Sequence, residues 1–218
     1  MPTEGPVLGI DCSGASAGAA LTRGGVVIAS RAEVMTSGHA ERLVPLIETL
    51  LDEARLTWRD LAAIGVGTGP GNFTGLRIAI AAARGLALAL DVPAAGVGAF
   101  EVLAHGLPRP VLASVPAPRH GATLAVVSDA GTSPPETAEA GALPRTLTVP
   151  AGVTCVGHEA AALAEAIGGR ACAPIHAPAE AAALIGADRA RRGAARPAPA
   201  YVRPPAAAPA EAPPALLE

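Results

Sequence analysis

Residues 63–90 read AIGVGTGPGNFTGLRIAIAAARGLALAL, and this stretch decides the fold because a strand pattern changes into a helix pattern within it. Residues 63–67 are short and apolar, which is typical of a buried strand. A Gly-Pro-Gly turn follows at residues 68–72. Beyond the turn, apolar residues continue to about Leu90, and Thr74 is the expected N-cap of a helix. The stretch therefore predicts a strand, a tight loop and a helix in succession.

The residues before this unit predict an antiparallel meander followed by a helix. Glycine turns join three strand-like runs, at residues 7–11, 18–22 and 26–29. A helix is expected over about 39–55, because apolar residues recur there at three- and four-residue spacing. Pro45 removes one backbone donor, so this helix either starts late, near Glu41, or kinks at the proline.

A meander followed by strands that alternate with helices indicates a mixed α/β sheet, completed here by a strand expected at 92–97. In the second half we expect strands at 111–115, 123–127 and 153–156 and helices at 159–167 and 179–192. The Pro-bearing region 107–110 is a domain joint, and Pro and Ala dominate from Arg196 onward. The predicted organisation is an N-terminal lobe at 1–106, a reduced C-terminal lobe at 107–195 and a flexible tail at 196–218.

The composition excludes several kinds of active site. The chain of 218 residues contains no Lys, so all 16 basic residues are Arg. Neither a lysine Schiff base nor the phosphate-binding lysine of a P-loop is therefore possible. The five His residues are scattered without H-x-x-x-H or H-E-x-x-H, and no Cys stands at zinc-ligand spacing from them. Because a G-x-S-x-G elbow is also missing, the sequence predicts neither a metal site nor a catalytic group of its own.

Charge and cysteine content bear on partners and compartment. The net charge of -3 argues against a stand-alone nucleic-acid binder, so any nucleic-acid role is expected to be shared with a partner. Arg residues concentrate between Arg189 and Arg203, where a solvated helix end and an RNA contact both stay open. Three Cys without C-x-x-C predict reduced, buried thiols. The most apolar run, 78–90, contains Arg84 and is too short for a membrane span, so we expect a cytoplasmic protein without a membrane contact or signal peptide.

The loop at residues 69–75 is the first candidate site. Its glycines allow a sharp turn and a close approach, and it leads into a helix N-terminus, where free amides favour an anion. Asp11 ends the first strand, where it either caps a turn or holds a metal-bound water near a phosphate. A tight structural turn and a phosphate or carboxylate site both stay open. The candidate residues for the anion site are Asp11, Ser13, Gly69, Gly71, Asn72, Thr74 and Gly75.

The helix after this loop carries the second candidate site. Ala81, Gly85 and Ala89 form a row with almost no side chain, which lets another helix approach closely. Packing of this row on the chain's own sheet is the alternative. If the row is exposed beside the helix at 39–55, the pair would form an apolar surface suited to a helical partner. The candidate interface residues are Leu43, Leu46, Ile47, Leu50, Ile78, Ala81, Ala82, Gly85 and Ala89.

Three ordered segments resemble the TsaB (YeaZ) family of bacterial tRNA-modification proteins: VLGIDCS at residues 7–13, HAERLVP at 39–45 and GPGNFTGLR at 69–77. PAYVR at 199–203 is similar to the P-x-Y-[LV]-R ending of that family. The resemblance is specific in the first hundred residues and thin from about 110 to 195. At 117–124 the chain reads APRHGATL, where family members commonly carry Asp-Ala-Arg-x-Gly-x-Val-Tyr, so the acid and the tyrosine are missing.

This resemblance implies an actin-like ATPase (ASKHA, RNase H-like) fold of two lobes with mixed sheets flanked by helices, the second lobe being reduced. It implies a non-catalytic subunit that docks TsaD through its N-terminal helices, is joined by the P-loop ATPase TsaE, and forms a homodimer when TsaD is absent. The complex would transfer a threonylcarbamoyl group to N6 of adenosine 37 in ANN-decoding tRNAs, and this chain would contact tRNA only through the complex. No cofactor is expected on the chain alone, although a nucleotide at a complex interface stays open.

An enzyme of the same fold is the alternative. A small-molecule kinase or nucleotide hydrolase would use Asp11 for a magnesium-bound water and the loop at 69–75 for phosphate. A peptidase is disfavoured, because metal ligands and a nucleophile elbow are both missing from the sequence.

Overall fold

The glycine-linked runs at the N-terminus form a meander, as the sequence predicts. In the computed structural model, which describes residues 5–35, 37–117, 121–193 and 195–202, three antiparallel strands follow one another: β1 (Val7–Asp11), β2 (Ser16–Arg23) and β3 (Val26–Val34). Two more strands, β4 (Ala63–Gly69) and β5 (Ala94–Gly98), add in parallel to β1 and give the order β3-β2-β1-β4-β5. The first lobe is therefore built on the mixed sheet that the sequence predicts.

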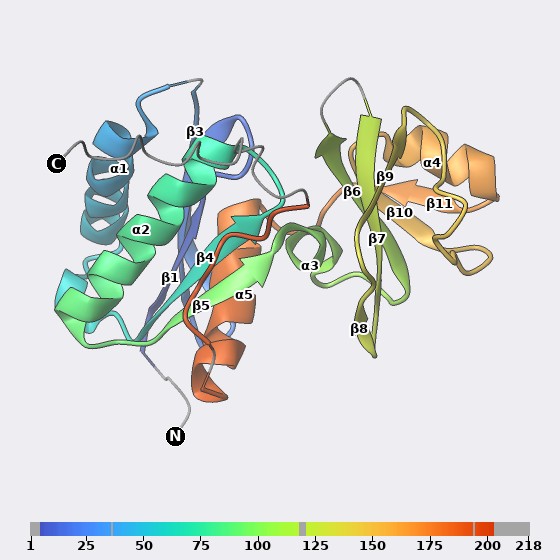
Figure 1. Ribbon diagram of the computed structural model, residues 1–218. Helices are drawn as coiled ribbons and strands as arrows, with labels where there is room; N and C mark the ends of the chain where they lie inside the picture. Colours follow the sequence, from blue (N-terminus) through green and yellow to red (C-terminus); the bar gives the residue numbers. More distant parts are fainter. Residues whose placement is uncertain (1–4, 36, 118–120, 194, 203–218) are drawn as a thin grey trace, which may run out of the picture.

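Helices cover both faces of this sheet (Figure 1). On one face lie α1 (His39–Glu53) and α2 (Phe73–Leu90), which share a core with the strand residues Leu8 and Ile64. The short 3-10 helix η1 (Trp58–Asp60) precedes β4. On the other face lies α5 (Pro178–Arg191), since the neighbouring strand residues Gly9 and Gly65 face it and side chains alternate along a strand.

Helix α5 can approach the strands closely because glycine faces it. A Cβ at Gly65 would lie 1.9 Å from the carbonyl oxygen of Ala182, and a Cβ at Gly9 would lie 2.0 Å from the carbonyl oxygen of Ala179. On the helix side, a Cβ at Gly186 would lie 2.5 Å from the Cα of Gly65. Helix and strand backbones are thus in direct contact, which requires glycine at these positions and small residues around them.

The second lobe has a sheet of its own. At its centre β6 (Val111–Ala117) pairs antiparallel with β7 (Gly121–Ser128). Beyond β6 the sheet continues with the parallel strands β10 (Thr154–Gly157) and β11 (Arg170–Cys172). Two short strands pair with β7, namely β8 (Gly131–Thr132) and β9 (Glu136–Glu139).

Helices also lie on the two faces of the second sheet. On one face, α4 (Ala160–Ile167) packs on β10 and β11 through Leu163. On the other, α3 (Ala99–Ala104) packs on β6 and also contacts β4, β5 and α5 of the first lobe. Helix α3 therefore lies where the two lobes meet (Figure 1).

Helix α1 begins at His39, as predicted, and continues through Pro45, so the late start near Glu41, one of the two alternatives for the proline, is wrong. Pro45 is exposed, so water can bond to the carbonyl of Glu41 that has lost its amide partner. The N-cap of α2 is Asn72 and not Thr74, because the side chain of Asn72 accepts the hydrogen bonds from the first free amides.

The second lobe is shorter than the predicted range 107–195. Helix α5 lies within that range but packs on the first sheet, in contact with β1, β2, β4 and β5. The chain therefore crosses between the lobes twice, once after α3 and once before α5 (Figure 1). The segment 195–202 also lies against the first lobe, where the amide of Ala200 donates to the carbonyl of Thr68 at 2.8 Å. The rest of the predicted flexible tail, 203–218, lies outside the described residues.

Candidate functional site

The structure brings together the loop at 69–75 and the turn after β1, the two halves of the predicted anion site. The amide of Asn72 donates to the carbonyl of Ser13 at 2.7 Å. A Cβ at Gly71 would lie 2.3 Å from that same carbonyl oxygen, and a Cβ at Gly75 would lie 2.1 Å from the carbonyl oxygen of Cys12. Gly69 has a φ of 87°, which favours glycine. These glycines therefore allow two backbone segments to touch, which is a structural role.

The amides at the start of α2 already have an acceptor. The Oδ1 atom of Asn72 accepts from the amide of Thr74 at 3.1 Å and from the amide of Gly75 at 3.2 Å. An anion at this helix end would have to displace that side chain to reach the same amides. The geometry therefore favours the tight structural turn over the phosphate site.

Asp11 caps the turn that follows β1. Its carboxylate accepts from the amide of Ser13 at 2.9 Å and from the hydroxyl of Ser13 at 2.8 Å. The other carboxylate oxygen lies 1.9 Å from where a Cβ of Gly67 would stand, so glycine is required there. Burial raises the pKa of Asp11, and the hydrogen bonds from Ser13 oppose that shift. Of the two interpretations of Asp11, the geometry supports the capping one.

A cleft of about 560 Å³ lies between the lobes, beside the loop at 69–75. Its polar side chains are those of Ser13, Asn72, Ser114 and His158, and the rest of its lining is mainly apolar. None of the described residues that line it is an Arg, so the described part of the cleft offers no guanidinium to a polyphosphate. Within the described ranges, no three His, Cys, Asp or Glu side chains come together as metal ligands. This arrangement does not favour the kinase or nucleotide hydrolase alternative.

The structure corrects the predicted contribution of α1 to a partner interface. Leu46, Ile47 and Leu50 have no exposed surface, and Leu43 is 1% exposed, because all four pack in the core beneath α1. A helical hydrophobic pattern identifies the buried face of a helix but not the surface that covers it. Here the chain's own sheet covers it. On the outward side of α1, Val44 is the exposed large apolar residue.

Helix α2 presents an exposed face of small and apolar residues, which includes the glycine–alanine row whose exposure the sequence left open. Ala81, Gly85 and Ala89 are exposed, and a Cβ at Gly85 would have nothing within 4 Å among the described residues. Leu88, which the sequence analysis missed, is 85% exposed beside this row. Its position one residue before Ala89 in an apolar run gave no signal of exposure. On the flank toward α1, the half-buried residues Ile78 and Ala82 pack against the core. We call the residues Ala81, Gly85, Leu88 and Ala89 the α2 face.

By length and hydropathy alone, α2 could cross a membrane. It has 18 residues with a mean hydropathy of 1.5, and it is the one helix of this kind in the part of the chain that the structure describes. Its inner side, with Leu76, Ala79, Ile80 and Ala83, is buried in the first lobe. The helix is therefore one layer of an α/β lobe, with an apolar face left on the outside.

The segment 195–202 packs along the N-terminal part of α2. The guanidinium of Arg77 lies 3.7 Å from the centre of the Phe73 ring, and its Nε donates to the hydroxyl of Tyr201 at 3.1 Å. The rings of Phe73 and Tyr201 are 5.4 Å apart. Tyr201 belongs to the late PAYVR motif, so two segments that were singled out in the sequence meet in space.

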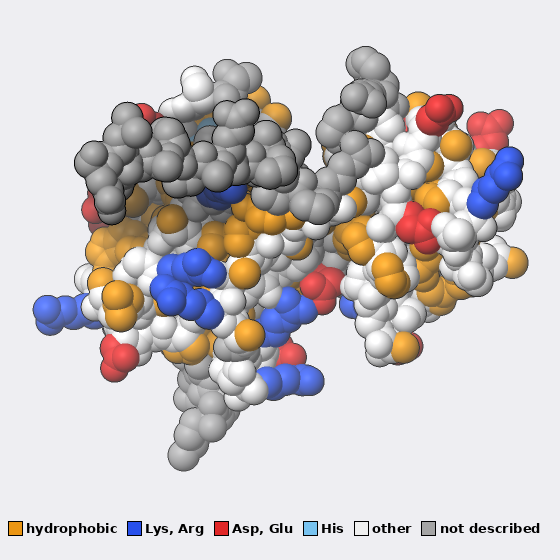
Figure 2. Space-filling model, in the orientation of Figure 1, with side chains coloured by type: hydrophobic (Ala, Val, Ile, Leu, Met, Phe, Trp, Pro, Cys, Tyr) orange, Lys and Arg blue, Asp and Glu red, His pale blue; other side chains and the backbone are white. Residues whose placement is uncertain are grey.

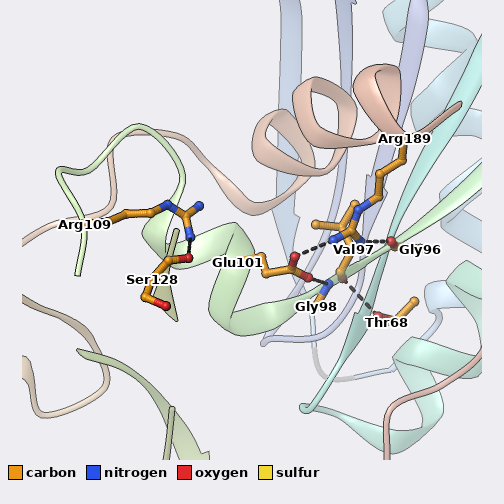
Figure 3. Close-up of polar contacts among 8 residues, drawn as sticks. All are labelled: Thr68, Gly96, Val97, Gly98, Glu101, Arg109, Ser128 and Arg189. Carbon is orange, nitrogen blue, oxygen red and sulfur yellow. Dashed lines mark hydrogen bonds and ion pairs between the residues drawn. The ribbon is translucent and has the colours of Figure 1, made fainter. Parts of the chain in front are cut away.

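Polar contacts hold α5 to the junction of the lobes (Figure 3). Arg189 reaches from α5 to the carboxylate of Glu101 on α3 and to the carbonyl of Gly96. The second oxygen of Glu101 accepts from the amide of Gly98 at 3.0 Å. One arginine of the basic concentration near the C-terminus is thus a structural residue, with a carboxylate partner within the chain.

Comparisons with known proteins agree with this architecture. A family model described as TsaD, tRNA N6-adenosine threonylcarbamoyltransferase, matches residues 22–133, just over half of the chain. The tRNA threonylcarbamoyladenosine biosynthesis protein TsaB of Bacillus subtilis is 38% identical over 98 residues, which cover 45% of this chain and 43% of that protein. The solved structure of YeaZ from Pseudomonas aeruginosa superposes with a TM-score of 0.72 at 26% identity, and the match covers 90% of this chain and 99% of that one.

The chain belongs to the TsaB (YeaZ) family. The predicted actin-like fold class is confirmed, and component A of (R)-2-hydroxyglutaryl-CoA dehydratase from Acidaminococcus fermentans shares the fold with a TM-score of 0.60 at 12% identity. The sequence matches span less than half the length of the curated TsaB relative. In this chain, the motifs behind the resemblance lie together: the loop of 69–77 packs on the turn of 7–13, and Tyr201 packs on Arg77.

Proposed function

We propose that this chain is a partner-binding subunit in the synthesis of threonylcarbamoyladenosine in tRNA, and that it docks a TsaD subunit through the α2 face. The observation that carries the proposal is the exposure of this face. A Cβ at Gly85 would meet no described atom within 4 Å, and Leu88 is 85% exposed on a helix whose other side is sealed in the core. Membership of the TsaB family and the match to the TsaD model support the same reaction.

The shape of the α2 face suits a second helix. A row of Ala, Gly and Ala at four-residue spacing leaves a shallow groove along the helix, so a partner helix can approach its backbone closely. Leu88 beside the row supplies the large apolar side chain that such an interface needs near its centre. Helix α1 would add its outward side near Val44 to the edge of the contact, in place of its four buried residues.

The chemistry of the reaction would lie on the partner. The buried, capping Asp11 and the apolar cleft give this chain no evident catalytic group among its described residues. In this proposal TsaD carries out the transfer to N6 of adenosine 37 in the cytoplasm, TsaE joins the pair, and any nucleotide binds at an interface of the complex. A second copy of this chain would cover the α2 face when TsaD is absent.

The experiment that tests the proposal is replacement of Gly85 by Leu. The new side chain would fill the groove, so we expect capture of TsaD to fall at least tenfold. Leu also has a higher helix propensity than Gly by roughly 0.8 kcal/mol, so the variant alone should be slightly more stable than the wild type. Loss of partner capture together with gain of stability separates a blocked interface from a folding defect.

A matched control uses the exposed Ala161 on α4 of the second lobe. Ala161→Leu adds a similar bulk on another helix surface, and it should leave capture of TsaD unchanged. Depletion of the chain in cells should lower threonylcarbamoyladenosine in tRNA, and Gly85→Leu should fail to restore it. Unchanged capture by Gly85→Leu would place the docking surface elsewhere, and unchanged tRNA modification after depletion would remove the proposed function.

A further inference from the structure

A pocket with two arginines lies on the flank of α2 that faces the segment 195–202. It has a volume of about 520 Å³, and Arg84 and Arg196 line it together with Leu88 and Asp91. Arg84 comes from the middle of α2 and Arg196 from the segment near the C-terminus, so the fold brings together two cations that are 112 positions apart in sequence. Figure 2 shows basic side chains, in blue, gathered over this side of the first lobe.

One donor of the Arg84 guanidinium has no acceptor in the part of the chain that the structure describes. Its Nε atom is buried and has no hydrogen-bond partner among the described residues. A buried donor without an acceptor is destabilising, so such a group is retained at a cost unless another molecule supplies the acceptor. Neither Arg84 nor Arg196 forms an ion pair with a described carboxylate, although Asp91 lines the same pocket.

Neighbouring arginines provide the contrast. Arg196 also lines an adjoining pocket of about 510 Å³, together with Arg189 and Arg192. Arg189 pairs with Glu101, and Arg192 pairs with Asp188 at 3.0 Å. These two arginines are neutralised within the chain, whereas Arg84 and Arg196 have no carboxylate partner among the described residues of a chain whose net charge is -3.

We propose that the pocket of Arg84 and Arg196 binds a backbone phosphate of RNA. A guanidinium presents paired N–H donors that match the oxygens of a phosphate, and a pocket open to solvent can accept a phosphate that belongs to a chain. The adjoining pocket shares Arg196, so the two pockets are contiguous along this side of the lobe. The inference rests on the proposed function, which supplies tRNA as the RNA in question.

The test is titration of the full-length chain, in its complex with TsaD, with a tRNA transcript, followed by NMR of the arginine Nε–Hε groups of this chain. Arg84→Gln and Arg196→Gln assign the two resonances, and Arg170→Gln, on β11 of the second lobe, assigns a control resonance. We expect tRNA to shift the resonances of Arg84 and Arg196 and to leave that of Arg170 unchanged. Parallel titrations with inorganic phosphate and with acetate separate a phosphate site from a general anion site. Equal shifts of all three resonances, or no shift at either pocket arginine, would overturn the proposal.

Affinity measurements on the complex with TsaD give the second readout. Each glutamine variant should weaken tRNA binding about five- to tenfold near 0.1 M salt and should lower the slope of log Kd against log salt by about one. Arg84→Lys keeps the charge and should lose less affinity than Arg84→Gln, while Arg170→Gln should match the wild type. Capture of TsaD should be unchanged in all of these variants. If the glutamine variants lose TsaD and keep their affinity for tRNA, the pocket belongs to the protein interface and the RNA proposal is wrong, although the proposed function stands.

Discussion

Replacement of Gly65 by Ala tests the packing of α5 on the first sheet. The new Cβ would lie 1.9 Å from the carbonyl oxygen of Ala182, whereas real Cβ contacts essentially never fall below 3.0 Å. Helix and strand would therefore have to separate by at least 1.1 Å, the difference between these two distances. Both partners are backbone, so rotation of a side chain cannot relieve the clash. Because α5 also rests on β1 and β5, the shift would loosen its other contacts.

The cost of Gly65→Ala should reach the upper end of the range for overpacked cores, about 3 kcal/mol or more in the free energy of unfolding. Gly85→Ala is the matched control, since its Cβ would meet no described atom within 4 Å and Ala is the better helix former, by about 1 kcal/mol. Urea unfolding followed by circular dichroism should therefore separate the two variants by roughly 4 kcal/mol. If Gly65→Ala is as stable as the wild type within about 0.5 kcal/mol, α5 does not lie on the sheet as described.

Three further predictions concern single groups. Cys12 is fully buried, and its thiol pKa is raised to about 12 by burial and by the neighbouring Asp11. Iodoacetamide should therefore label Cys172 in the native protein and reach Cys12 only in denaturant, which mass spectrometry can show. Because the pKa of Asp11 is raised in the folded protein, its contribution to stability is full at low pH and is lost as the pH rises through that folded-state pKa. In urea titrations, Asp11→Asn should therefore be more stable than the wild type at pH 7, and the difference should vanish in acid. Tyr201→Phe removes only the hydrogen bond from Arg77 and should lower the free energy of unfolding by about 0.5–1 kcal/mol. Tyr201→Ala also removes the contact with Phe73 and should lower it further. Equal losses of stability would show that the ring contact contributes nothing.

The sequence pattern predicted the helices and strands of the first lobe well, because each pattern there fits one kind of element. Glycine turns between short apolar runs could only join neighbouring strands, and β1 to β3 form that meander. The apolar period of residues 39–55 gave α1 almost at its observed bounds, His39–Glu53. The short elements β8, β9, β11 and α3 were missed, since two to six residues do not establish a period.

The place of α5 could not be predicted from its own residues. An alanine-rich helix fits either sheet, and the deciding feature is the pair of glycines, Gly9 and Gly65, far away in the sequence. A strand pattern does not indicate that a glycine within it makes room for another backbone, as Gly9 and Gly65 do here.

The candidate sites show the same difference between pattern and context. For the loop at 69–75, sequence could not show that the glycines face Cys12 and Ser13 or that Asn72 occupies the amides at the start of α2. For the interface, the apolar stripe of α1 and the small-residue row of α2 both predicted a partner-binding surface, and the sequence did not distinguish between them. Tertiary packing buried the first and left the second exposed. The pocket of Arg84 and Arg196 was beyond sequence reasoning, because the two residues meet only in the folded chain.

The most direct measurement of the central claim is thiol footprinting of the α2 face. Leu88→Cys, made in a Cys172→Ser background, places a reactive group at a position that is 85% exposed, and Ala161→Cys on α4 provides a control in the second lobe. When a saturating amount of TsaD is added, the labelling rate at position 88 should fall at least tenfold while the rate at position 161 stays the same. A complex that forms in full and leaves position 88 as reactive as in the free chain would contradict docking through α2.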